Sequence, residues 1–133
     1  MSSFALQQAV YAALASSTDL QALIGNPPRL FDYVPRDSAF PYVVLGDETE
    51  SDWSTATEGG TEHLFTVHAW SRNAGHREAK QIAEIIRAAL HDVPLTLADA
   101  TLIDLRHLAT DFTRESDGQT FRASLRFRAV TEP

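Results

Sequence analysis

The sequence predicts an α+β fold in which an antiparallel β-sheet carries two main helices packed on one face. Three observations support this prediction: two segments repeat apolar residues at helical spacing, several segments are rich in β-branched and aromatic residues, and the last segment alternates apolar with polar residues. The elements follow in the order helix, strands, helix, strands, which favours an antiparallel sheet with helices on one side. Since no repeat or linker interrupts the chain, we expect a single domain over residues 1–133.

The N-terminal segment from Phe4 to Ser16 is expected to form an amphipathic helix. A short second helix should follow, with Ser17 or Thr18 as its N-cap and Gly25 as its stop signal. The first helix is predicted from apolar residues that recur at steps of three and four, namely Phe4, Leu6, Ala9, Val10, Ala13 and Leu14.

The middle of the chain is expected to supply three strands. Arg29 to Val34 is rich in aromatic and β-branched residues and predicts a short edge strand, after which a polar loop runs from Arg36 to Phe40. Tyr42 to Gly46 and Glu62 to Trp70 then predict a long antiparallel hairpin across a segment rich in Ser, Thr, Gly and acidic residues.

The best-defined helix of the sequence precedes Pro94. Its apolar positions are Ala79, Ile82, Ala83, Ile86 and Leu90, and its polar positions are Arg77, Lys80, Glu84 and Arg87.

Two further strands are expected at Thr101 to Thr113 and Gln119 to Thr131, joined by a turn at residues 115–118. The second strand alternates, so its two faces can be assigned. One face carries Phe121, Ala123, Leu125, Phe127 and Ala129, and the other carries Arg122, Ser124, Arg126 and Arg128.

Composition restricts the compartment and the partners. A chain of 133 residues can bury roughly two-thirds of its unfolded surface. It has no cysteine, hence no disulfide, thiolate metal site or thiol nucleophile, and a cytosolic origin fits best. The sequence has neither a secretory signal pattern nor a membrane-spanning run. The net charge of −7 argues against binding of DNA or anionic lipid as the main role of the protein.

Catalytic and metal-binding patterns are weak. His63 and His68 lie five residues apart on a predicted strand and should face opposite sides, so they cannot chelate one metal together. His76 and His91 flank the long helix, where capping, a favourable interaction with the helix dipole or simple solvation is expected. No nucleophile elbow, phosphate loop or dinucleotide fingerprint is present. We therefore predict no catalytic residues, no metal and no cofactor, and no enzymatic activity.

An acidic segment and a basic row are the candidate interface residues. We interpret the acidic residues Asp47, Glu48, Glu50, Asp52 and Glu58 as a solvated or partner-facing mobile loop, because their spacing does not match a calcium loop. The basic row consists of Arg122, Arg126 and Arg128, which could form ion pairs with an acidic partner. Pairing with Asp104 or Glu62 of the same chain is an equal alternative, and Arg106 could join the row.

Four pieces of sequence, in order, carry a family resemblance. They are FPYVVLG at Phe40–Gly46, HAWSRNAGHREAKQIAEIIRAAL at His68–Leu90, the turn Asp117–Gly118, and TFRASLRFRAVTE at Thr120–Glu132. Because it has these four pieces in this order, the chain resembles the small tail-completion or tail terminator proteins of tailed bacteriophages and gene transfer agents. The specificity lies in the order and spacing of the pieces, and the resemblance covers nearly the whole chain.

The resemblance implies a structural role at the tail–neck junction of a phage-like particle, after synthesis in the bacterial cytoplasm. A tail terminator forms a ring, usually of six copies, on the head-proximal end of the tail tube, where it stops tube polymerisation and joins the tail to the head. The implied partners are other copies of the chain, the tail tube protein and a neck or stopper protein, with DNA passing through the ring and no membrane involved. The alternatives are a head-completion or stopper protein of the same particle, and a small ligand-binding domain or hydrolase.

Overall fold

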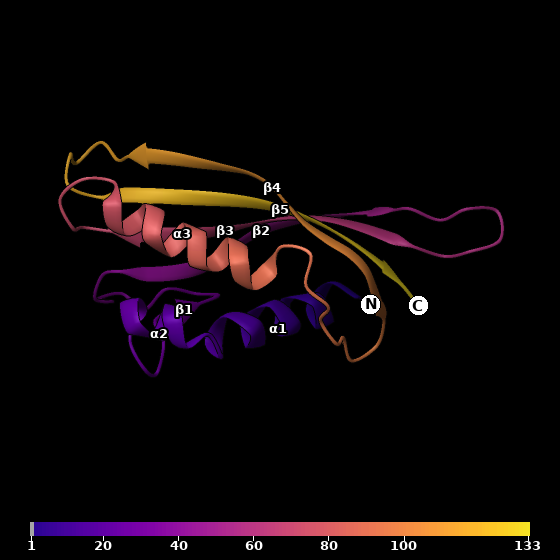
Figure 1. Cartoon of the computed structure of the whole chain (residues 1–133). Coiled ribbons are helices and arrows are strands. Elements are labelled where there is room, and N and C mark those ends of the chain that lie inside the picture. Colours follow the sequence, from indigo (N-terminus) through magenta and orange to yellow (C-terminus); the bar gives the residue numbers. More distant parts are fainter. Residues whose placement is uncertain (1) are drawn as a thin grey trace.

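The computed structural model describes residues 2–133 and contains three helices and a five-stranded sheet (Figure 1). This arrangement confirms the predicted α+β class. In chain order the elements are α1 (Ser2–Ala15), α2 (Thr18–Ile24), β1 (Leu30–Phe31), β2 (Tyr42–Asp52), β3 (Thr61–Ser71), α3 (Arg77–Leu90), β4 (Thr101–Arg114) and β5 (Phe121–Glu132).

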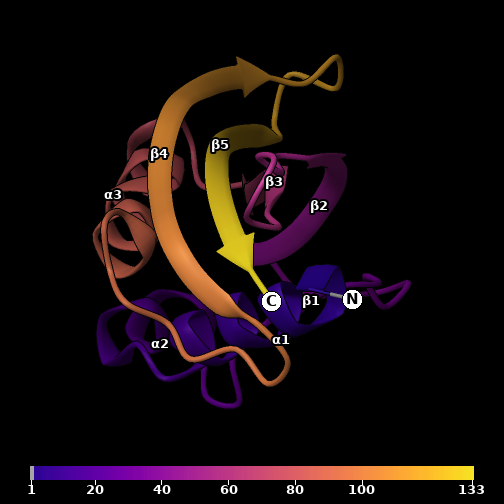
Figure 2. The ribbon, with the colours of Figure 1, turned by 90° about the vertical axis from the view of Figure 1, so that its right-hand side faces the viewer.

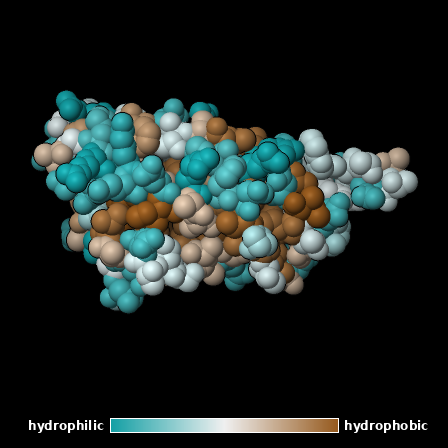
Figure 3. Space-filling model, viewed as in Figure 1, coloured by the Kyte–Doolittle hydropathy of each residue, from teal (hydrophilic) through white to brown (hydrophobic). Residues whose placement is uncertain are grey.

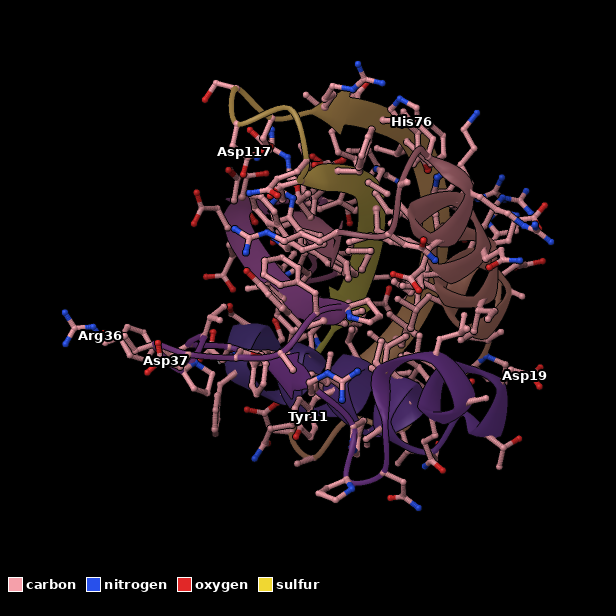
Figure 4. The ribbon with its side chains drawn as sticks, turned by 90° about the vertical axis from the view of Figure 1, so that its left-hand side faces the viewer. Tyr11, Asp19, Arg36, Asp37, His76 and Asp117 are labelled. Atoms are coloured by element: carbon pink, nitrogen blue, oxygen red, sulfur yellow. The ribbon has the colours of Figure 1, made fainter. Side chains whose placement is uncertain are left out.

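The sheet has the strand order β1-β2-β3-β5-β4, and every neighbouring pair except β1–β2 is antiparallel. The predicted edge strand at Arg29–Val34 shrinks to Leu30–Phe31 and pairs in parallel with β2, which corrects the expectation of a purely antiparallel sheet. The intervening loop, residues 32–41, carries the chain back before β2 begins, so both strands run in the same direction. Figure 4 shows Arg36 and Asp37 of this loop projecting away from the body.

The helices cover one face of the sheet (Figure 2). α3 packs against β3, β4 and β5, whereas α1 lies along β1 and β2 and also contacts α3. The predicted alternation of β5 is confirmed, because Phe121, Ala123, Leu125, Phe127 and Ala129 are all buried. Phe127 stacks on Phe65 of β3 with ring centroids 5.4 Å apart, so the core joins the two central strands.

The first helix differs in detail from its prediction. It spans Ser2–Ala15 rather than Phe4–Ser16, and Phe4 is 66% exposed, while Ala5 is buried in its place. The buried stripe runs through Leu6, Val10 and Leu14, at steps of four, and leaves Phe4 on the edge of that stripe.

The signals that end and cap the helices are partly confirmed. Ser17 caps α2 by accepting the Leu20 N–H at 3.2 Å, and Gly25 ends it at a φ of 93°. His76 is the N-cap of α3, but its side chain makes no capping bond and packs edge-on against Phe121. His91 is the C-cap of α3, and its Nδ1 atom accepts the His107 backbone N–H at 3.0 Å. The His91 side chain therefore links the end of α3 to β4.

Bulges bend β2 and β4. In β2, Gly46 and Asp47 together oppose Thr66, and a Cβ on Gly46 would lie 2.8 Å from the His68 ring and 2.9 Å from the Thr66 carbonyl. In β4 the extra residues are Ile103 and Leu108, whose side chains are 52% and 53% exposed. The bulges thus change which residues face the helices and which face solvent.

The β2–β3 hairpin extends well beyond the rest of the molecule (Figure 1). Its register continues to the Asp52–Thr61 pair, so both strands have eleven residues. We call residues 50–60, which form the projecting end of this hairpin, the arm. Within residues 2–133, the longest helices have fourteen residues, and none is both long and apolar enough to cross a bilayer.

Candidate functional site

The predicted acidic loop is mostly strand. Asp47, Glu48, Glu50 and Asp52 belong to β2, and only Glu58 lies in the turn between β2 and β3. The expectation of a loop is therefore wrong for the first four residues. The reason is the alternation of acidic with hydroxyl residues from Glu48 to Asp52, which lets the strand continue past the bulge with a period of two.

One of the acidic side chains, Glu48, is partly buried. Past the bulge, Glu48 and Glu50 share the helix-covered face of the sheet with His63 of β3. An oxygen of Glu48 lies 2.8 Å from His63 Nδ1, and one of Glu50 lies 3.9 Å away. Ser3 also donates a hydrogen bond to Glu48 at 2.9 Å. Asp47, Glu50, Asp52 and Glu58 are exposed.

His63 is fully buried and joins both ends of the described chain to the root of the arm. Its Nε2 atom lies 3.0 Å from the Thr131 hydroxyl and 3.2 Å from the Ser2 hydroxyl, and Thr131 donates to Ser2 at 3.1 Å. A consistent proton arrangement has Nδ1–H donating to Glu48 and Nε2 accepting from Ser2. We call Ser2, Glu48, His63 and Thr131 the polar cluster.

The polar cluster has two chemical possibilities that sequence reasoning missed. Ligand atoms of Glu48, Glu50 and His63 lie within 4.8 Å of one another, so this is where the described residues would hold a metal ion. Ser2, His63 and Glu48 also follow the order hydroxyl, imidazole, carboxylate of a hydrolytic triad. The buried His63 imidazole and its contact with Thr131 instead favour a structural role, in which the polar cluster holds the two ends of the described chain to the sheet. No sequence signal identified the polar cluster, because the Glu50–His63 register depends on the bulge.

The basic row lies on the sheet face that the helices leave bare. Arg128 bonds to Glu62 at 2.6 Å and lies 3.7 Å from Asp104, which confirms the same-chain alternative for this residue. Arg122 lies 3.2 Å from Glu115.

The other two arginines of this face are more exposed. Arg126 meets Asp111 at 3.4 Å, but both side chains are more than half exposed, and such pairs contribute about 0–1 kcal/mol. Arg106 lies opposite Arg128 and pairs with Asp104. Arg126 is therefore the member of the predicted row that is most accessible to a partner.

His68 lies on the same bare face, beside the row. Its Nδ1 atom lies 2.8 Å from the Ser124 hydroxyl. Burial lowers the pKa of His68, and the nearby Arg122 lowers it further, while Asp47 acts in the opposite direction. The imidazole is therefore neutral at pH 7, and this face gains no positive charge from it.

The turn between β4 and β5 lies at the end of the molecule opposite the arm (Figure 1) and is ordered by Asp117. Its carboxylate accepts the backbone N–H groups of Gln119 and Thr120 at 2.9 and 2.8 Å and the Thr120 hydroxyl at 2.6 Å. These hydrogen bonds hold the pKa of Asp117 below its ordinary value. The predicted turn at residues 115–118 is confirmed.

The molecule is a small α+β protein with charged surfaces, a projecting arm and a bare sheet face. Comparison with known proteins identifies its family. A family described as "Tail completion protein gp17" matches residues 8–132. The protein therefore belongs to the tail completion protein gp17 family and has a structural role in completing a phage-type tail.

Two relatives match nearly full length. The tail completion protein gp17 of Bacillus phage SPP1 is 24% identical over 128 residues, which cover 96% of this chain and 92% of the relative. A chain in the solved virion of a native gene transfer agent particle is 34% identical, with a TM-score of 0.92 over 99% of this chain and 98% of that one. The resemblance inferred from the four sequence pieces is confirmed at the level of the family.

Proposed function

We propose that this protein is the tail terminator of a phage-like particle. Copies of the chain, six in the expected ring, cap the head-proximal end of the tail tube, stop its polymerisation and join the tail to the head. The observation that carries the proposal is the full-length similarity to a chain of a gene transfer agent virion, at 34% identity and a TM-score of 0.92. A match of this extent favours the same kind of place in the particle.

A ring requires a heterologous interface, in which one surface of a subunit binds a different surface of the next. The shape of this chain suits such a contact, because the arm projects at one end and the bare sheet face offers Arg126 elsewhere. Reversal of charge in Arg126→Glu is expected to weaken ring formation. Unchanged rings in that variant would remove the basic row from the interface.

The exposed acids also support passage of DNA through the ring without specific binding. Asp47, Asp52 and Glu58 are exposed, and the chain carries a net charge of −7. Like charge repels the phosphate backbone. Particles carrying Asp47→Asn, a position outside the arm, are expected to deliver DNA more slowly. Unchanged delivery would argue against a place for Asp47 near the DNA path.

The proposal includes a single domain without catalytic activity, cofactor or membrane contact. The competing hydrolase function rests on the order of Ser2, His63 and Glu48. An esterase screen of the wild type against Ser2→Ala tests it, and activity lost in the variant would favour the hydrolase.

The decisive experiment mixes the purified protein with the cognate tail tube protein and follows the products by mass photometry and negative-stain microscopy. Rings at one end of shortened tubes are the expected result. A protein that leaves tube length unchanged but binds the head connector would be the stopper instead. A persistent monomer that binds neither would overturn both assignments.

A further inference from the structure

A groove between α3 and β4 carries more positive than negative charge. The groove has a volume of about 480 Å³, and its charged lining residues are three cations, Arg77, Lys80 and Arg87, and one carboxylate, Glu84. All three cationic side chains are exposed, and within residues 2–133 none of them lies within ion-pair distance of an acidic group. This contrasts with the arginines of β5, each of which has a carboxylate partner. We call this feature the basic groove.

The basic groove also offers an aromatic surface. Phe112 of β4 lines it and is 40% exposed, and the Lys80 ammonium lies 5.0 Å from the centre of the Phe112 ring. An exposed aromatic ring bordered by cations is suited to an occupant that combines an apolar side chain with negative charge.

The arm has the complementary chemistry. Residues 47–60 contain five carboxylates and no lysine or arginine. Trp53, at the start of the turn, is 53% exposed, and Asp52 and Glu58 flank the same turn and are exposed as well. The Trp53 ring also contacts the Arg128 guanidinium of the same chain, 4.9 Å from the ring centre, so the arm presents a half-exposed tryptophan beside two carboxylates.

The arm is held in shape by its own hydrogen bonds. Trp53 N–H donates to the Gly60 carbonyl at 2.9 Å, and Thr55 N–H donates to the Glu58 carbonyl at 2.8 Å. Asp52 accepts the Ser54 N–H at 3.0 Å, and hydrogen bonds to Ser54 hold its pKa below the ordinary value. An ordered arm loses less conformational entropy on docking than a flexible loop would.

The arm and the basic groove lie at opposite ends of one molecule. In Figure 1 the arm reaches the far right, whereas α3 and the end of β4 that border the groove occupy the left half. Figure 3 shows the arm standing clear of the body from the same viewpoint. A subunit cannot fill its own groove in this arrangement, but it can fill that of a neighbour, which is the head-to-tail contact that closes rings.

We propose that the arm of one copy docks in the basic groove of the next copy, with Trp53 against Phe112 and with Asp52 and Glu58 facing Arg77, Lys80 and Arg87. This contact names the interface of the ring and so rests in part on the proposed terminator function. It also assigns a role to the polar face of α3, which the remaining contacts of the chain leave unused.

Disulfide trapping tests the contact directly, because the chain has no cysteine of its own. We expect the double variant Thr55→Cys/Gln81→Cys, oxidised in the presence of the tail tube protein, to give a ladder of covalent dimers, trimers and larger species. The matched control Thr55→Cys/Ser116→Cys places the second thiol on the exposed β4–β5 turn and should give no ladder beyond dimers. Equal ladders from the two variants would overturn the proposal.

Exchange of charge between the arm and the basic groove tests the electrostatic basis of the proposed contact. The groove variant Arg77→Glu/Arg87→Glu and the arm variant Asp52→Lys/Glu58→Lys should each associate at least about ten-fold more weakly than the wild type. Mixed together, they should recover association, since each acidic arm then meets a basic groove and each basic arm an acidic one. Arg36→Glu, in the projecting loop, is the control and should behave as wild type.

The outcomes separate this proposal from the terminator function. Rings that form without the specific ladder, or a mixture that fails to recover while circular dichroism shows both variants folded, would reject arm docking alone. A specific ladder without capped tubes would support the contact and reject the terminator function. Cross-linking of the groove thiol to the tail tube protein instead would assign the groove to that partner and overturn the proposal.

Discussion

The strands β2 and β3 run through both the body of the molecule and its arm, yet their surroundings differ between the two regions. In the body, β3 lies between β2 and β5 with helices over one face, and Val67 and Ala69 are fully buried. Along the arm, residues 51–59 are all exposed. The difference teaches that close packing is confined to one end of the hairpin. The proposed role of the arm therefore predicts that substitutions affect stability and assembly independently.

The strongest test of this separation is Phe127→Ala in the body. Phe127 is fully buried and stacked on Phe65, so its removal should lower the free energy of unfolding by about 3–5 kcal/mol. Chemical denaturation monitored by circular dichroism measures the change. A loss below about 1 kcal/mol would show that the core closes around the gap and would weaken the contrast.

The next effect is expected at His63, where the arm joins the body. His63→Ala leaves Glu48 and Thr131 without their buried partner and should cost about 1–3 kcal/mol. The neighbouring Leu64→Ala, at a side chain that is 42% exposed, is the control and should cost clearly less. Equal losses would show that the polar cluster contributes nothing beyond ordinary packing.

The same assay tests the metal site. Addition of Zn²⁺ to the wild type would raise the midpoint of denaturation if Glu48, Glu50 and His63 bind the ion.

Substitution in the arm is expected to have a smaller effect on stability and a large effect on assembly. Trp53→Ala removes only the contact with the Arg128 guanidinium, 4.9 Å from the ring centre, and should change the free energy of unfolding by less than about 1 kcal/mol. Ring or cap formation should fall sharply. Tyr33→Ala removes an aromatic ring that is 91% exposed on the loop before β2, and assembly should not change. Equal loss in both variants would refute a specific role for the arm.

The smallest expected effect is a dependence of stability on pH that arises in the body. Burial lowers the pKa of both His68 and His107 below 6.5, and Arg122 and Arg87, respectively, lower them further. The unfolded chain therefore binds more protons than the folded one below about pH 6.5, and stability should fall as the pH drops through this value. Thermal unfolding between pH 7.5 and 5 measures this fall, and His68→Gln should reduce its slope. An unchanged slope would exclude His68 as a source.

How much of this could be predicted depends on how local the signal is. The buried face of β5 and the extent of α3 follow from periodicity over a dozen residues, and both are confirmed. Phe4 lies at the edge of a helical stripe, where its burial is decided by the neighbouring element rather than by the period. The parallel pairing of Leu30–Phe31 depends on the path of the following loop, which composition does not specify.

The candidate site was harder to predict for a related reason. Glu62 and Asp104 were recognised as alternative partners of the basic row because strand pairing places them beside Arg128. The polar cluster was missed, since the bulge at Gly46 and Asp47 shifts the register before Glu48 and Glu50 reach His63. The polar face of α3 follows from its spacing, but that its cations form no ion pair within residues 2–133 is a property of the whole surface and could not be derived from spacing.

The bulges at Ile103 and Leu108 also affect the subunit before it joins a particle. β4 is the outermost strand of the sheet, and a straight strand of fourteen residues there would invite other copies to pair with it indefinitely. Each bulge interrupts the row of backbone donors and acceptors that such pairing needs. The two bulges therefore reduce the tendency of free copies to pair edge to edge into fibres.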